Sequence, residues 1–177
     1  MPDAPPVTTA TLPDNPNASL IPPIMPHVPL VGWLHALALD ARPGKNPRMP
    51  GIRRIATSPD PYAPYRISQA MQVGDLLFVS GQAAIDETGE LVGVGDFDAQ
   101  AEQTFRNLER ILAAAGSGLD RVVKVTIFLT DMSYFPKIVD LRERWFREPY
   151  PADTIVEVRA LALPELEIEI EAVAVVR

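Results

Sequence analysis

The distribution of proline divides the chain into two parts. Fifteen of its 19 prolines lie within the first 64 of 177 residues. Proline fixes φ and removes a backbone N–H donor, so this region cannot form a long helix or a central strand. Extended, polyproline-like chain is the expected conformation. We therefore assign residues 1–56 to a proline-rich N-terminal arm and residues 57–177 to a folded domain.

The arm is too apolar for a free linker. Its middle, residues 20–34, is rich in aliphatic side chains and contains Met25 and Trp33. We expect the arm to pack against a globular surface, either that of its own domain or that of a neighbouring subunit. The alternative is a mostly disordered tail with one short helix near Val31 to Ala41.

The composition excludes several kinds of chemistry in the domain. The chain has no cysteine, which excludes disulfides, thiolate nucleophiles and zinc–thiolate sites. Its two histidines, His27 and His35, both lie in the arm, so a Ser–His nucleophile within the domain is excluded as well. Two histidines eight residues apart are more often packed or exposed than metal-bound, and we expect neither a metal nor a cofactor.

The charge is unevenly distributed. Residues 1–56 carry five Arg and Lys against three Asp, a net charge of +2. Because the whole chain has a net charge of −7, residues 57–177 carry −9. An acidic domain is a poor partner for a phosphate backbone, and we expect no nucleic-acid partner. The basic residues between positions 42 and 54 could contact an anionic surface, but a solvated linker or pairing with the acidic domain is the more common outcome.

The sequence gives no sign of a membrane span or an export signal. The N-terminal Met1-Pro2-Asp3 lacks basic residues, and the apolar stretch from Leu30 to Ala41 is too short to cross a bilayer and contains His35 and Asp40. We therefore predict a soluble, cytoplasmic protein without a membrane partner.

Five strands are predicted after the arm. The first two are joined by a turn at Gly74-Asp75. The third, VVKVTIFL, is rich in β-branched residues and is predicted to be buried. The last alternates polar and apolar residues over its first seven positions. The predicted ranges are 66–73, 75–80, 122–129, 154–160 and 165–175.

Two helices are predicted between these strands. The first covers residues 98–115, with Asp96 or Asp98 as its N-cap and Gly116 after its end. Apolar residues at spacings of 4, 3, 4 and 3 give it one buried stripe. That stripe consists of Ala101, Phe105, Leu108, Leu112 and Ala115.

The second helix is predicted to begin near Ser133, its expected N-cap, with Pro136 in its first turn. Pro149 and Pro151 end it. Its predicted buried face consists of Phe135, Ile138, Leu141 and Trp145.

The resulting order, β-β-α-β-α-β-β, predicts an α+β sandwich with two helices on one face of a mixed sheet. The other sheet face has no helix of its own. Its apolar side chains need a cover, and oligomerisation is the simplest one.

Several local motifs occur in the order found in one known family. They are VGDLLFVSGQ (73–82), DETGEL (86–91), AEQTFRNLERILAAAGSGLDRVVKVTIFLTDM (101–132) and EIEAVAV (169–175). On these stretches the chain resembles the RidA/YjgF family, also known as endoribonuclease L-PSP. The resemblance implies a chorismate-mutase-like subunit and a homotrimer with a central β-barrel and ligand clefts between subunits. Members of the family hydrolyse reactive enamines and imines, such as 2-aminoacrylate and its imine, to a keto acid and ammonia.

The chain departs from this family at the residue that binds the substrate carboxylate. Active members carry an Arg in a P-A-R stretch, and the resemblance places Pro151-Ala152-Asp153 there. Two unit charges ~4 Å apart interact by about 4 kcal/mol at an effective dielectric constant of 20, so attraction would become repulsion of similar size. We therefore expect a 2-imino acid to bind badly unless another cation, such as Arg159, reaches the cleft.

The resemblance implies four substrate-binding residues. A Tyr precedes Ser-Gln-Ala in many relatives, whereas here Ile67 does and Tyr65 lies two residues earlier. Ile155 stands where several relatives have Cys. Gly81 matches a position where the backbone lines the cleft, and a glycine there allows close approach of a ligand. The alternative for Gly81 is a β-bulge or the end of a strand.

Glu169 matches the family Glu that positions the hydrolytic water. It is one of four glutamates predicted on one strand face, for which a solvated surface is the alternative; these are Glu165, Glu167, Glu169 and Glu171. We expect Asp153 and Glu169 to share one cleft and to act on an iminium or protonated enamine that has no nearby carboxylate. Glu169 would orient or deprotonate water, and Asp153 would stabilise the positive nitrogen. The alternative is that Asp153 is exposed or caps a loop, and that the cleft has no catalytic activity.

Three functions follow from these observations. The first is an enamine- or imine-directed hydrolase (deaminase) that acts on a small molecule. The second is a non-enzymatic trimer that binds a small molecule or a protein, so enzymatic activity itself stays open. The third, ribonuclease activity, is disfavoured by the acidic domain and its lack of histidine.

Overall fold

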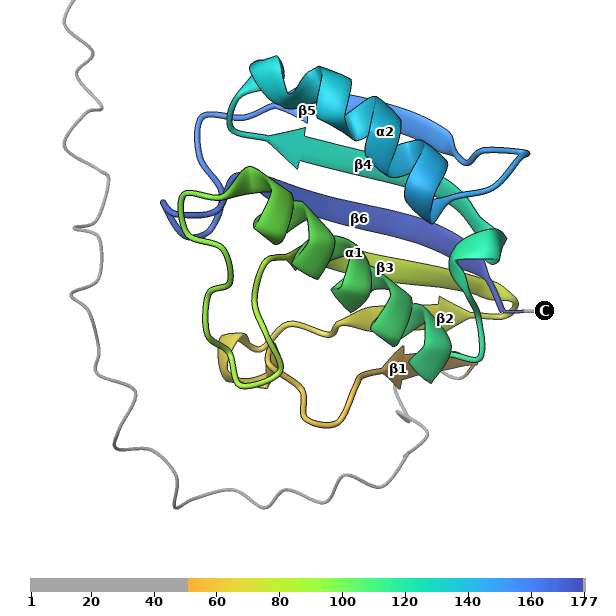
Figure 1. Ribbon diagram of the computed structural model, residues 1–177. Helices are drawn as coiled ribbons and strands as arrows, with labels where there is room; N and C mark the ends of the chain where they lie inside the picture. Colours follow the sequence, from red (N-terminus) through yellow and green to blue (C-terminus); the bar gives the residue numbers. More distant parts are fainter. Residues whose placement is uncertain (1–50, 177) are drawn as a thin grey trace, which may run out of the picture. The chain divides into compact units, whose positions relative to one another are not determined.

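The computed structural model describes residues 51–176, which form one six-stranded sheet and two helices (Figure 1). The predictions for residues 1–50, including those for His27 and His35, lie outside the described residues. The strands are β1 (Ile52–Ile55), β2 (Ala70–Val73), β3 (Leu76–Ala83), β4 (Val122–Leu129), β5 (Ala152–Glu157) and β6 (Ile168–Val175). The helices are α1 (Phe97–Ala114) and α2 (Phe135–Trp145), and short 3-10 helices cover Ala63–Tyr65, Leu119–Arg121 and Met132–Tyr134.

The sheet is mixed, as the sequence predicted. Its strand order is β1-β2-β3-β6-β4-β5, and only β4 and β5 run parallel. The predicted α+β fold is confirmed, with one additional strand. This edge strand, β1, pairs with β2 from Ile52 opposite Val73 to Ile55 opposite Ala70. Its Arg54 forms an ion pair with Asp60, so at this position the basic cluster pairs with the acidic domain.

Four predicted strands differ from the observed ones at their ends, and of these β3 covers Leu76–Ala83 rather than 75–80. β2 begins only at Ala70, because Ala63–Tyr65 forms a 3-10 turn and Arg66 has a left-handed φ of 60°. β5 covers Ala152–Glu157 rather than 154–160. β6 begins at Ile168, so Glu165 and Glu167 precede the strand and do not share a strand face with Glu169.

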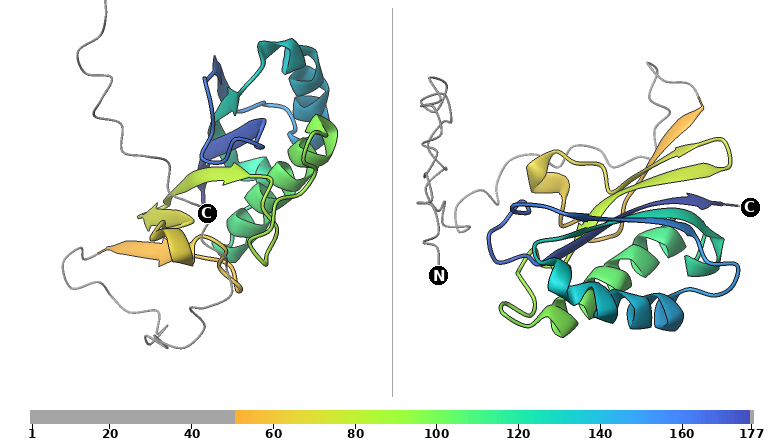
Figure 2. Two further views of the ribbon diagram at one scale, coloured as in Figure 1. Left: turned by 90° about the vertical axis from the view of Figure 1, so that its left-hand side faces the viewer. Right: turned by 90° about the horizontal axis from the view of Figure 1, so that it is seen from above.

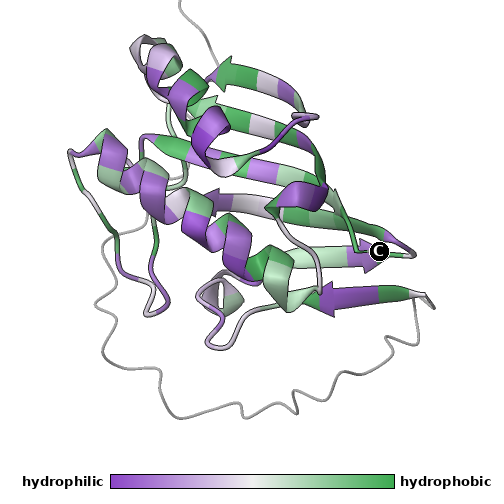
Figure 3. Cartoon of the chain, turned by 45° about the vertical axis from the view of Figure 1, so that its right-hand side comes forward, coloured by the Kyte–Doolittle hydropathy of each residue, from purple (hydrophilic) through white to green (hydrophobic). Residues whose placement is uncertain are grey.

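Helix α1 is amphipathic, and its predicted buried stripe is confirmed. Asp96 rather than Asp98 is the N-cap, and its Oδ1 accepts hydrogen bonds from the backbone N–H groups of Asp98 and Ala99 at 3.1 Å each. Gly116 follows the helix with a φ of +75°, a conformation that glycine adopts without strain. Hydrophilic residues cover the outer side of the helix (Figure 3).

Helix α2 differs from the prediction at its start. Asp131 rather than Ser133 caps the preceding 3-10 turn, and its side chain accepts a hydrogen bond from Ser133 N–H at 2.8 Å. Pro136 lies in the first turn, as predicted. Ile138 is fully buried, but Phe135 is 45% exposed because it is the first residue of the helix and lies at the margin of the core. Leu141 and Trp145 are partly buried against the core.

Both α-helices cover the same face of the sheet, and the opposite face carries no α-helix among residues 51–176 (Figure 2). Alternation along β6 shows the two faces clearly, because Ile168, Ile170, Ala172 and Ala174 are buried beneath the helices. On the other face, which we call the open face, three large apolar side chains are each between 43% and 47% exposed. They are Val73, Leu76 and Phe78.

No helix within residues 51–176 is both long enough and apolar enough to cross a membrane. The cytoplasmic location stays a prediction.

Candidate functional site

Glu169 lies near the start of strand β6, in the middle of the sheet. Its Cα is paired with Ala83 of β3 on one side and with Phe128 of β4 on the other. Because Ile168 and Ile170 point toward the helices, the side chain of Glu169 points to the open face. The glutamate is therefore held by rigid backbone on both sides while its carboxylate remains partly accessible.

A β-bulge makes room for this carboxylate. The register between β3 and β6 shifts between Val79 and Gln82, so Ser80 and Gly81 together oppose a single residue of β6. A Cβ atom at Gly81 would lie 1.7 Å from Glu169 Oε1 and 2.6 Å from Glu169 Cδ. Only glycine leaves this space free. Gly81 thus forms a bulge, and the group that approaches its backbone in the described chain is the Glu169 carboxylate.

The carboxyl group of Glu169 binds its proton more tightly than an ordinary glutamate does. Partial burial raises its pKa, and the negative charge of Glu171 raises the pKa further. Among residues 51–176, no hydrogen bond or ion pair satisfies the carboxylate. An unpaired carboxylate with raised basicity can accept a proton from a bound water molecule.

The raised pKa has a consequence for stability. The folded chain disfavours the ionised form of Glu169, and this destabilises the fold once the group ionises. The destabilisation is absent at a pH below the pKa that Glu169 has in the unfolded chain. It is complete at a pH above the pKa that Glu169 has in the folded chain. Glu169→Gln is therefore expected to raise the free energy of unfolding at neutral pH, and this gain should shrink as the pH falls through the pKa of the carboxyl group. Urea unfolding of both proteins at pH 4 and pH 7, at one protomer concentration, measures the difference. A gain of equal size at both pH values would contradict the assignment.

Asp153 lies on strand β5 and faces helix α2. It is paired in register with Val125, which is fully buried beneath the helices. Arg142 Nε of α2 donates a hydrogen bond to Asp153 Oδ2 at 2.7 Å, and Oδ1 is buried without a partner within the described chain. Asp153 is thus neither exposed nor a loop cap, and its charge is balanced by Arg142.

A single chain does not bring Asp153 and Glu169 together, because the two carboxylates point to opposite faces of the sheet. They can share a cleft only if one protomer supplies Asp153 and its neighbour supplies Glu169. Ile155 lies on the same face as Asp153 and packs against the core. Its place in the predicted site depends on the same assembly.

The other two predicted substrate-binding residues lie in the connection between β1 and β2. Tyr65 is 55% exposed and Ile67 is 47% exposed, so both side chains are available to a ligand or to a neighbouring subunit. The tyrosine that contacts the bulge is Tyr62, which is buried and donates a hydrogen bond from its hydroxyl to Gly81 O at 3.0 Å. Sequence reasoning missed Tyr62 because no local pattern marks a turn residue that reaches a strand 19 positions away.

A hollow of about 320 Å³ lies farther along the open face. Lys124 lines this hollow. Its Nζ donates hydrogen bonds to Val125 O at 2.6 Å and to Thr154 Oγ1 at 3.0 Å. No carboxylate of the described residues lies within ion-pair distance of it. The open face therefore presents both a cation and carboxylates among apolar side chains. The remaining lining residues include Met71, Phe78, Ser80, Thr126, Glu171 and Val173.

The residues of this site lie within a stretch that matches a known protein family. Residues 55–176 match the sequence profile of the family described as Endoribonuclease L-PSP. A RutC family protein of Pyrococcus horikoshii is 45% identical over 118 residues, which are 66% of this chain and 90% of that protein. A Dermatophagoides farinae protein named 2-iminobutanoate/2-iminopropanoate deaminase is 37% identical over 120 residues, which are 67% of this chain and 91% of that protein. Among solved structures, RidA of an Antarctic Psychrobacter species is similar with a TM-score of 0.64 and 40% identity, covering 70% of this chain and 98% of that chain.

Proposed function

The chain belongs to the RidA/YjgF family, also called endoribonuclease L-PSP, and on that premise we propose that it hydrolyses the C=N bond of a small imine or protonated enamine. The observation that carries the proposal is Glu169, a partly buried, unpaired carboxylate of raised pKa seated on the Gly81 bulge. A relative named as an imine deaminase supports the same class of reaction.

Glu169 acts first as a base, then as an acid and then as a base again in the proposed reaction. Its carboxylate takes a proton from water while the water oxygen bonds to the C=N carbon, and the π electron pair moves to nitrogen. The carbinolamine that results receives the proton from Glu169 on its nitrogen. With the iminium as substrate the nitrogen is then an ammonium leaving group. The carbinolamine hydroxyl gives its proton to the Glu169 carboxylate as the C=O bond forms, and the C–N bond breaks with its electron pair on nitrogen, which releases ammonia and a carbonyl product. Glu169 finally returns this second proton to solvent. General acid–base catalysis of this kind contributes roughly 10²–10⁴-fold to the rate.

A homotrimer is proposed as the working assembly, with the active cleft between neighbouring protomers. The open face supports this proposal, since its exposed apolar side chains form a surface that monomeric proteins rarely leave uncovered. A cleft between protomers is also the one place where Glu169 and Asp153 can approach each other. Sedimentation of the purified chain tests the assembly, and a monomer would remove the cleft.

The substrate is proposed to be an imine whose binding does not depend on a carboxylate. Arg142 balances the charge of Asp153 at 2.7 Å, so Asp153 repels a substrate carboxylate less than the sequence alone predicts. The Arg142–Asp153 pair is close to neutral. It therefore does not repel a substrate carboxylate as a free aspartate would, and it does not bind one as the free arginine of a P-A-R stretch does. Ammonia release from a panel of small imines, with and without a carboxylate, tests this proposal. Absence of ammonia release from every imine, together with binding of any of them, would favour the non-enzymatic alternative.

Removing the charge of Asp153 is expected to change substrate preference. Asp153→Asn keeps the shape of the side chain but leaves Arg142 as an unbalanced, partly buried cation. A partly exposed ion pair is worth about 1 kcal/mol, so kcat/KM for 2-iminopropionate should rise roughly fivefold, while that for a carboxylate-free imine should stay unchanged. The double variant Arg142→Gln/Asp153→Asn should lose the gain. Equal changes for both substrates would show that Asp153 acts on stability rather than on binding.

A further inference from the structure

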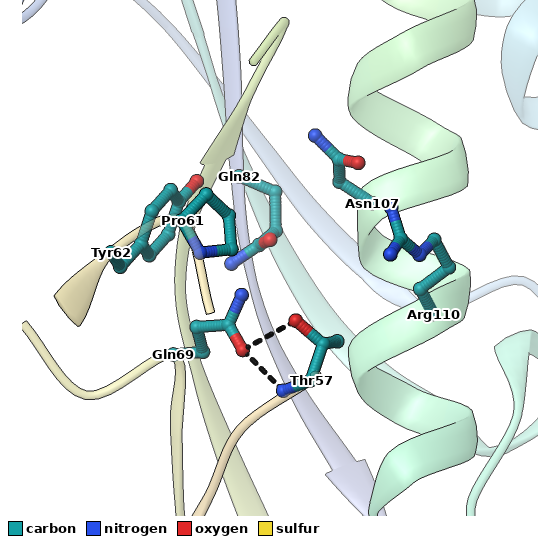
Figure 4. A pocket seen from close by; sticks show the side chains of 7 residues that line it. All are labelled: Thr57, Pro61, Tyr62, Gln69, Gln82, Asn107 and Arg110. Atoms are coloured by element: carbon teal, nitrogen blue, oxygen red, sulfur yellow. Dashed lines mark hydrogen bonds between the residues drawn. The ribbon is translucent and has the colours of Figure 1, made fainter. Parts of the chain in front are cut away.

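Tyr62 is buried although it belongs to the connection between two strands. It is 7% exposed, and its backbone N–H donates to Asp60 Oδ1 at 3.0 Å, while its carbonyl accepts from Tyr65 N–H at 3.0 Å. Together with Gln82 it lines a small pocket that Asn107 and Arg110 of α1 also line (Figure 4). The turn that contains Tyr62 is therefore fixed at both ends, and the phenol is held in one orientation.

The hydroxyl of Tyr62 fixes the bulge in β3. It donates to Gly81 O at 3.0 Å, whereas the other donor near this carbonyl, Gln82 Nε2, lies at 3.4 Å. Burial raises the pKa of the Tyr62 phenol to about 12, so the hydroxyl remains a donor throughout the neutral range. The negative charges of Glu169 and Asp60 also disfavour its ionisation.

Other contacts hold Ser80 but do not hold the carbonyl of Gly81. Ser80 N–H donates to Gln69 O at 3.0 Å, Ser80 Oγ donates to Ser68 O at 2.8 Å, and Gln82 Nε2 donates to Ser80 O at 2.9 Å. At Gly81, the Tyr62 hydroxyl is the short contact. Loss of this donor would leave the carbonyl without a good partner and would allow the bulge to relax.

From this chain of contacts we infer that Tyr62 is a positioning residue for Glu169, acting through the Gly81 carbonyl. The inference rests on the proposed function, because positioning matters only if Glu169 handles the proton. The Glu169 carboxylate packs against the backbone of Gly81. A shift of this backbone by a few tenths of an ångström changes how much water reaches the carboxylate. Tyr62 itself does not contact the substrate in the proposed reaction. It keeps Glu169 in a partly buried position.

Tyr62→Phe tests the inference, because phenylalanine keeps the ring and removes only the hydroxyl. Carbon-13 NMR titration of the glutamate carboxyl groups is expected to show a lower pKa for Glu169 in the variant. The kcat for imine hydrolysis should fall roughly tenfold with little change in KM, and the acid limb of its pH profile should move in the same direction as the NMR titration. Tyr134→Phe is the matched control. It removes a phenol hydrogen bond of 2.7 Å to Glu167 Oε1 and should leave the titration of Glu169 unchanged.

An unchanged titration of Glu169 in Tyr62→Phe would overturn the inference and leave Tyr62 with a structural role only. If Tyr62→Phe does not fold, Tyr62→His provides a second test, since it keeps a ring and a donor and should retain part of the shift. The NMR measurement does not require a substrate. A shifted titration in a protein that hydrolyses no imine would therefore refute the proposed function while supporting the positioning role.

Discussion

Replacing Glu169 by glutamine is expected to lower kcat for imine hydrolysis about 100-fold to 1000-fold at neutral pH. Glutamine keeps the size of the side chain but cannot accept a proton from water, so the variant loses the acid–base contribution. Substrate binding should change little, because the effect lies in the transition state and not in the affinity. Ammonia release under saturating and subsaturating substrate separates kcat from KM.

Glu171→Gln is the control for this experiment. Glu171 lies two residues farther along the same strand, on the same face, but its side chain is exposed. Because the charge of Glu171 contributes to the raised pKa of Glu169, its removal should move the acid limb to lower pH and leave the plateau rate within about twofold. If Glu171→Gln loses as much activity as Glu169→Gln, catalysis depends on the total negative charge of the open face and not on one carboxylate.

Gly81→Ala is expected to abolish most of the activity by displacing the Glu169 carboxylate. The new methyl group would lie 1.7 Å from Oε1, a separation that no side chain tolerates. Either the glutamate must rotate away or the bulge must shift, and overpacking of this kind costs about 1–3 kcal/mol of stability. We expect kcat to fall by an amount close to that of Glu169→Gln, with a clear loss of stability in urea unfolding.

A double-mutant cycle separates the clash from other effects of Gly81→Ala. In a Glu169→Ala background the space beside Gly81 is open, so adding the methyl group should cost little stability and no further activity. Additive losses in the cycle would mean that Gly81 matters for the backbone of the bulge rather than for Glu169.

Regular periodicity made most of the fold predictable. Helix α1 and strand β4 agree with prediction because their buried residues repeat at the helical or strand period over many positions. β1 was missed because it is a four-residue edge strand, half of it arginine, next to a proline-rich region. Its existence depends on pairing with β2, which no local pattern reveals.

The candidate site was only partly predictable, because part of it depends on contacts between residues far apart in the sequence. The position of Glu169 on the open face follows from alternation in β6. The direction of Asp153 does not, because it requires the parallel register of β4 and β5 and the position of Arg142 on α2. The bulge at Gly81 and its contact with Tyr62 arise from tertiary packing across 19 residues of sequence. Sequence could therefore locate the carboxylates but not the groups that set their charge and orientation.

The most direct test of Glu169 as the acting group is the pH dependence of kcat/KM for ammonia release from a carboxylate-free imine, measured for the wild type and for Glu169→Gln. Comparing the two proteins on one substrate removes any titration of the substrate itself. We expect the wild-type rate to fall on the acid side with a midpoint above the pKa of an ordinary glutamate, and this limb to be absent from the variant's low, flat profile. The same acid limb in both proteins would contradict this expectation.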